Sequence, residues 1–132
     1  MPITDRAPRH PRRRLAAAIS PLAVIATGLF VHAVLPDTPV TDIAGDALYA
    51  AAAYCAVVLC VARWSSWLVA VVAGGWCVAV ELFQLSGIPL ALGATFPPAM
   101  LVLGTVFDAR DLVVYIATVV VAGIIDATVR RR

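Results

Sequence analysis

The sequence has little charge, and it lacks two polar residue types altogether. Of its 132 residues only 14% are charged, lysine and asparagine are absent, and there is one glutamate and one glutamine. Soluble domains usually carry about a quarter charged residues, and disordered chains combine low hydrophobicity with high net charge. The composition therefore excludes a disordered chain and a soluble nucleic-acid-binding domain, and we expect no nucleic-acid partner.

Cysteine is also scarce, and the three cysteines form no recognisable motif. Cys55 and Cys60 lie in one apolar run and Cys77 lies in another, without CxxC spacing or nearby histidines. This excludes a disulfide-stapled secreted domain and offers no pattern for a metal or redox site. We interpret the cysteines as small buried apolar residues, and we expect no metal and no other cofactor.

Apolar residues, by contrast, make up 62% of the chain, and its mean hydropathy is +0.95. A membrane-spanning helix needs about 20 consecutive apolar residues. The sequence supplies four such runs, and the first is interpreted as an uncleaved helix although its front half resembles a signal peptide. We therefore predict an all-α integral membrane domain over residues 15–129, with transmembrane helices at about 15–35, 44–62, 64–85 and 112–129. Asp108 and Asp111 favour a helix start just before the fourth of these helices, at about 112–129.

A further apolar stretch, residues 88–107, is nearly long enough to span but contains five helix breakers: Pro89, Gly93, Pro97, Pro98 and Gly104. Broken helices leave backbone groups unpaired, and lipid cannot satisfy them. We predict that this stretch is an outer-face re-entrant or interfacial segment with a short helix starting at Pro97–Pro98.

Arginines supply every basic charge, and they are concentrated at the chain ends. With four spans, nine of the ten arginines lie on one side and only Arg110 on the other. Because positive loops stay in the cytoplasm, both termini are predicted to be cytoplasmic. Residues 1–14 are interpreted as a basic disordered tail that touches anionic lipid, and residues 130–132 as a basic C-terminus. The expected partners are membrane lipids, and a homo-oligomer is left open.

Small and polar residues recur at three- and four-residue steps on three of the predicted helices, which places them on single helical faces. The stripes are Asp46, Tyr49, Ala53, Ala56, Cys60; Ala70, Gly74, Cys77, Glu81, Gln84; and Asp111, Tyr115, Thr118, Ala122, Asp126. With Trp64 at the inner boundary, a rise of 1.5 Å per residue puts Glu81 roughly 26 Å further along, at the outer edge. We therefore predict an outer-face polar cluster of His32, Asp46, Glu81, Gln84, Asp111 and Tyr115.

Four members of this cluster, His32, Asp46, Glu81 and Asp111, also have a purely structural interpretation. Charged residues inside spans are costly and often functional, yet Glu81 could instead join helices by a hydrogen bond. Asp46 and Asp111 suit helix N-termini, and His32 suits a polar interface. Asp126 is expected to pair with Arg130 four residues later.

Four motifs in order resemble a known family: Gly45-Asp46-Ala-Leu-Tyr49, Glu81-Leu-Phe-Gln84-Leu, Leu101-Val-Leu-Gly104-Thr-Val-Phe107 and Asp111-Leu-Val-Val-Tyr115. Together they resemble domain of unknown function family 2809, over about residues 20–128. A more distant similarity is to VanZ-like proteins. The resemblance implies a small polytopic protein of the bacterial inner (plasma) membrane with no established activity. Gly93 stands where the family pattern has an arginine, and Thr118 where it has a glycine.

Several functions remain open at this point. The favoured hypothesis is a non-enzymatic membrane protein that binds a lipid headgroup or envelope precursor at the outer polar cluster. The alternatives are a membrane-embedded enzyme on a lipid-linked substrate, an oligomeric small transporter or channel, and a structural or assembly role. No DDxxD, HExxH, GxSxG or serine-based motif is present, so we assign no catalytic, cofactor-binding or metal-binding residue.

Overall fold

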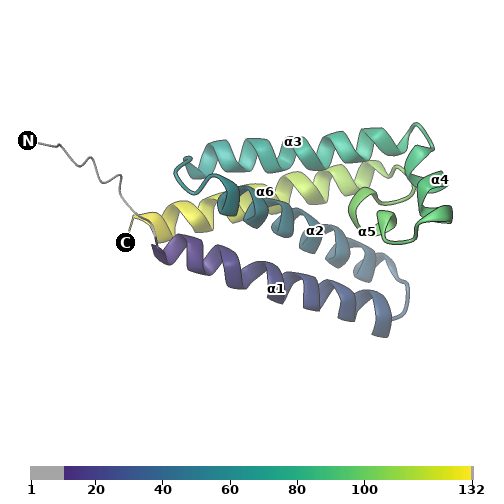
Figure 1. The fold of residues 1–132 in the computed structure, drawn as a ribbon, viewed down its shortest axis with the longest axis horizontal. Coiled ribbons are helices and arrows are strands. Elements are labelled where there is room, and N and C mark those ends of the chain that lie inside the picture. Colours follow the sequence, from purple (N-terminus) through teal and green to yellow (C-terminus); the bar gives the residue numbers. More distant parts are fainter. Residues whose placement is uncertain (1–10, 132) are drawn as a thin grey trace, which may run out of the picture.

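A computed structural model describes residues 11–131, and this part of the chain contains six helices and no strand (Figure 1). The four long helices lie side by side, whereas α4 and α5 are short and lie together at one end. The bounds are α1 Pro11–Val34, α2 Pro39–Cys60, α3 Ser66–Gln84, α4 Ile88–Thr95, α5 Ala99–Leu103 and α6 Ala109–Arg130.

The four long helices are long and apolar enough to cross a membrane, as predicted. The shortest, α3, has 19 residues and so rises roughly 28 Å, close to the ~30 Å thickness of a hydrocarbon core. Large apolar side chains lie exposed along all four helices, which is costly in water and favourable in lipid. The protein is therefore an all-α membrane protein.

The helices α2 and α6 begin earlier than the apolar runs do, because polar residues cap them. Thr38 caps α2 through a capping box with Thr41, and Pro39 follows at a position that favours helix starts. Asp108 caps α6 by accepting a hydrogen bond from the backbone N–H of Arg110, 2.8 Å away. Asp46, expected near a helix N-terminus, thus lies seven residues inside α2.

The core is formed by α2, α3 and α6, while α1 packs mainly against α2 at the edge. All five residues of the predicted α3 stripe are buried. A Cβ on Gly74 would meet Val119 at 3.3 Å, so α3 and α6 approach closely there. The α2 stripe was wrong in its last turns: Ala56 and Cys60 are exposed, because α2 turns the face of Ala50, Tyr54 and Val58 to the core.

Residues 88–107 form two short helices joined by turns, and neither is long enough to cross a membrane. The helix expected at Pro97–Pro98 is α5, which begins at Ala99 directly after Pro98. The helix α4 was not expected, and Pro89 near its start is compatible with it because the first turn needs no backbone donor there.

The predicted basic tail lies largely outside the described residues. Its last part, residues 11–14, was wrongly assigned to the tail, because Pro11 already begins α1. Proline is favoured in the first turn of a helix, and Arg13 is buried against the bundle.

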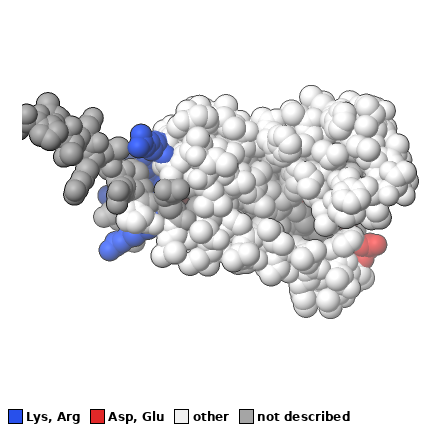
Figure 2. Space-filling view, in the orientation of Figure 1, with Lys and Arg blue, Asp and Glu red and all other residues white. Residues whose placement is uncertain are grey.

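Charge is segregated between the two ends of the bundle (Figure 2). The start of α1, the end of α6 and the α2–α3 connection meet at one end (Figure 1). It is called here the arginine end, and it carries Arg13, Arg63, Arg130 and Arg131. The opposite end, the acidic end, carries α4, α5 and the carboxylates of Asp42, Asp46, Glu81, Asp108 and Asp111.

Candidate functional site

Glu81 lies in the last turns of α3 and is the largest fully buried side chain of the described residues, with 0% exposure. Its Oε1 atom accepts a hydrogen bond of 2.6 Å from the backbone N–H of Asp108, the N-cap of α6. The positive end of the α6 dipole favours a carboxylate at this place. Its Oε2 atom is also buried, yet it has no hydrogen-bond partner among the described residues. Oε1 therefore joins α3 to α6, while the nearest side-chain partner of the rest of the carboxylate is Tyr115.

Gln84 lies one turn further along α3, and α5 holds it in place. Its Nε2 donates to the carbonyl of Leu103 over 2.9 Å, whereas its buried Oε1 has no partner among residues 11–131. The next residue after Leu103, Gly104, ends α5 with a φ of +64°, and a Cβ there would collide with the Gln84 amide. A glycine is required on both grounds.

Asp46, Asp111 and Tyr115 complete this group. The carboxyl of Asp46 interacts with Asp111, Arg110 and Glu81, and Tyr115 is near the three carboxylates. Its ring packs against that of Tyr49, with 5.9 Å between centroids. The structure thus brings together five of the six residues proposed from the sequence.

The sixth, His32, is exposed near the end of the edge helix α1. None of the hydrogen bonds or ion pairs in the described part of the chain connects it to the other five. The cluster is therefore defined here as Asp46, Glu81, Gln84, Asp111 and Tyr115, and is called the acidic-end cluster.

Three residues that sequence reasoning did not assign to the cluster support it. The guanidinium of Arg110 lies 3.6 Å from carboxylate oxygens of both Asp108 and Asp111 and 3.9 Å from Asp42. The Tyr49 hydroxyl donates to the carbonyl of Val102 over 2.7 Å, and Trp76 donates to that hydroxyl over 3.0 Å. The contribution of Arg110 could have been predicted from its position between Asp108 and Asp111 in the sequence. The bond from Tyr49 to α5 could not, because it depends on the tertiary fold.

A second polar cluster lies at the arginine end, and it corrects the expected pairing of Asp126. Asp126 pairs with Arg13, not with Arg130, through bonds of 2.6 and 2.9 Å. Tyr54 donates to the same carboxylate over 2.7 Å. Arg13 also donates to the carbonyls of Ala62 and Trp64, and Arg130 donates to Trp64. Arg13 pairs with Asp126 in place of Arg130 because it reaches the carboxylate inside the bundle. The exposed fraction is 5% for the Arg13 side chain and 12% for that of Asp126.

Among the described residues, no group of three histidine, cysteine, aspartate or glutamate side chains is arranged to hold a metal ion. The acidic-end cluster instead presents hydrogen-bond acceptors: three buried oxygens without hydrogen-bond partners among residues 11–131, on Glu81, Gln84 and Asp111, and the carboxyl of Asp46. Such a site can receive N–H or O–H donors.

Comparison with known proteins gives one match. No curated protein and no solved structure matches the chain, and the similarity to VanZ-like proteins is not shown. Residues 34–119, which include α2 through the first half of α6 and the whole acidic-end cluster, match the family described as protein of unknown function (DUF2809). Because this match covers more than half of the chain, the protein belongs to the DUF2809 family.

Proposed function

We propose that this membrane protein binds the polar headgroup of a membrane lipid or envelope precursor at the acidic-end cluster. The observation that supports the proposal is the buried Oε2 atom of Glu81, which has no partner in the described structure. An unpaired buried acceptor costs about 1–3 kcal/mol, and more when it is charged. A ligand that donates a hydrogen bond to this atom would recover that cost.

The cluster selects the chemistry of the ligand. Arg110 is the only basic residue between positions 64 and 129, whereas the acidic end carries six carboxylates, the five named above and that of Asp37. A bare anion would meet net repulsion here. The ligand that fits carries N–H or O–H donors, such as the ammonium of an ethanolamine headgroup or the hydroxyls of a glycerol or sugar headgroup.

The segment 88–107 gives such a ligand a place at the membrane surface. Phe96, Leu101 and Val106 are exposed on it, and α5 is tied to the bundle through Gln84 and Tyr49. In this proposal the exposed apolar side chains rest in the interfacial layer, and the headgroup enters between this segment and the helix ends.

The proposed orientation places the acidic end on the outer face of a bacterial inner membrane. Its support is the positive-inside rule, applied to arginines that gather at the opposite end.

The test compares Glu81→Gln with wild type. Glutamine keeps an oxygen for the Asp108 N–H but replaces the free acceptor with an NH₂ group. Purified protein is incubated with phosphatidylethanolamine or with phosphatidylcholine, which has no headgroup donor, and retained lipid is measured by native mass spectrometry. We expect wild type to prefer phosphatidylethanolamine. We expect Glu81→Gln to bind it about tenfold to a hundredfold less, because hydrogen bonds to charged groups are worth about 1.5–3 kcal/mol.

Asp42→Asn is the matched control, since it removes an exposed carboxylate at the same end. Equal retention by wild type and Glu81→Gln, with both folded, would show that Glu81 only joins α3 to α6. Sensitivity of cells to envelope-directed antibiotics provides a second measurement on the same variants.

A further inference from the structure

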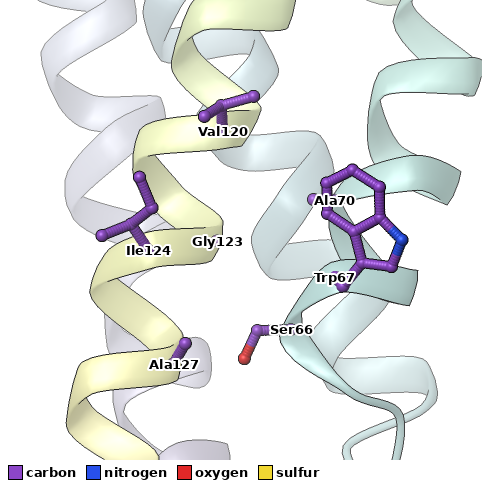
Figure 3. Close-up of a pocket in the computed structure, with 7 residues that line it drawn as sticks. All are labelled: Ser66, Trp67, Ala70, Val120, Gly123, Ile124 and Ala127. Carbon is purple, nitrogen blue, oxygen red and sulfur yellow. The ribbon is translucent and has the colours of Figure 1, made fainter.

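An apolar groove runs along the line of contact between α3 and α6 near the arginine end (Figure 3). Its volume is about 220 Å³, and Figure 3 shows side chains from both helices bordering it: Ser66, Trp67, Ala70, Val120, Gly123, Ile124 and Ala127. The groove exists because the residues in its middle are small, and a Cβ on Gly123 would meet Ala70 at 3.4 Å. It lies outside the acidic-end cluster, at the opposite end of both helices.

We propose that this groove is a binding site for an anionic phospholipid, with one acyl chain in the groove and the phosphate against Arg63, Arg130 and Arg131. The groove cannot select a lipid by itself, because surrounding lipid tails are as apolar as its walls. Selection must come from the polar groups at its end.

Three arginines lie just beyond the arginine end of the groove. Arg130 and Arg131 follow Ala127 by three and four residues, which places them on the same face of the α6 segment. Arg63 precedes Ser66 by three residues in the α2–α3 connection and is exposed. The bond from Arg130 to the Trp64 carbonyl, 2.9 Å long, holds these two segments together. An anionic headgroup at this position would face cations from both sides.

Ser66 adds a polar group inside the groove. Its side chain is buried, with 6% of the residue exposed, and its hydroxyl lies beside the carboxylate of Asp126. Ser66 also begins α3, whose N-terminal dipole end favours negative charge.

Trp67 indicates that the groove lies at the depth of the membrane interface. It borders the groove and is 75% exposed, as tryptophans at the boundary between headgroups and tails are. Arg13 does not contribute, since Asp126 already pairs with it. A second copy of the chain fits the groove less well, because a parallel two-fold contact would bring both sets of arginines together.

The experiment measures the retention of phosphatidylglycerol relative to phosphatidylcholine by native mass spectrometry. Ala127→Leu fills the groove, and Ala117→Leu is its control, since Ala117 is exposed on the same helix and does not line the groove. We expect Ala127→Leu to lower the preference for phosphatidylglycerol at least fivefold, and Ala117→Leu to leave it unchanged.

The role of the arginines is tested by charge-matched variants. Arg63→Gln/Arg130→Gln/Arg131→Gln is expected to lose about tenfold or more of the preference, since each arginine near anionic lipid contributes about 1 kcal/mol. Arg6→Gln/Arg9→Gln/Arg12→Gln removes the same charge and should have a much smaller effect. Equal losses in the two triple variants would overturn the proposal in favour of general electrostatic attraction.

Two further results distinguish this site from other occupants and from the acidic-end cluster. A wild-type dimer that Ala127→Leu abolishes would show that a second copy occupies the groove, which would also overturn the proposal. Glu81→Gln should keep the phosphatidylglycerol preference, so that failure of one site is not mistaken for failure of the other.

Discussion

At the scale of single residues, Gly104 meets two requirements at one position. Its φ of +64° disfavours any residue with a side chain, and its missing Cβ leaves space for the Gln84 amide. We predict that Gly104→Ala lowers the free energy of unfolding by about 1–3 kcal/mol, through backbone strain and displacement of Gln84. Denaturation in mild detergent measures this change.

The control for this prediction is Gly75→Ala. Gly75 lies inside α3, and a Cβ added there would have nothing within 4 Å, so alanine should leave stability unchanged or raise it by up to about 1 kcal/mol. Equal stabilities of Gly104→Ala and wild type would show that α5 adjusts without strain, and that Gly104 does not hold Gln84.

The burial of a polar side chain could be predicted from the sequence where that residue stands alone in an apolar run. Glu81 is the only glutamate and lies in an apolar run, so its burial on a helical face could be anticipated. The partner of Asp126 could not be predicted, because Arg13 lies 113 positions away in the sequence. Arg130, only four residues after Asp126, offered a local alternative. Short-range spacing indicates only what neighbours in the sequence can do.

At the scale of helices, the attachment of α1 depends on its first turn. Outside that turn α1 packs mainly against α2, while Arg13 reaches α6 and the α2–α3 connection. Removing one partner of a buried ion pair leaves the other charge unpaired and costs about 3–5 kcal/mol. We predict a loss of this size for Arg13→Gln, measured by thermal denaturation in detergent, and almost none for the exposed Arg12→Gln.

A double-variant cycle tests the same attachment. Arg13→Met combined with Asp126→Leu leaves no unpaired charge and should recover most of the stability. If Arg13→Gln melts like Arg12→Gln, the ion pair does not hold α1 in place.

The long helices could be predicted because length and hydropathy suffice to define a spanning segment. The segment 88–107 could be recognised as non-spanning by its breakers, but its division into α4 and α5 could not. That division depends on Tyr49 and Gln84, which lie on α2 and α3 and donate hydrogen bonds to backbone carbonyls of α5. The rotation of α2 was missed in its last turns because small residues cover most of its surface.

At the scale of the whole molecule, the separation of charge predicts a fixed orientation. Alkaline phosphatase fused after Arg132 should be inactive, and green fluorescent protein fused there should fluoresce, because arginine-rich ends stay in the cytoplasm. In a cysteine-free background, Asp37→Cys should react with an impermeant maleimide from outside, and Arg131→Cys only after permeabilisation. The reverse labelling pattern would contradict the orientation and move the acidic-end cluster to the cytoplasmic face.

The pair of Arg13 and Asp126 also has a consequence for assembly. Its partners come from near the start and near the end of the chain, and both lie outside the segment shared with the family. During synthesis α1 emerges first, so Arg13 has no carboxylate to bind until the last helix has entered the membrane. The ion pair can therefore form only after α6 has joined the bundle, whereas the bonds from Arg13 to the carbonyls of Ala62 and Trp64 can form earlier.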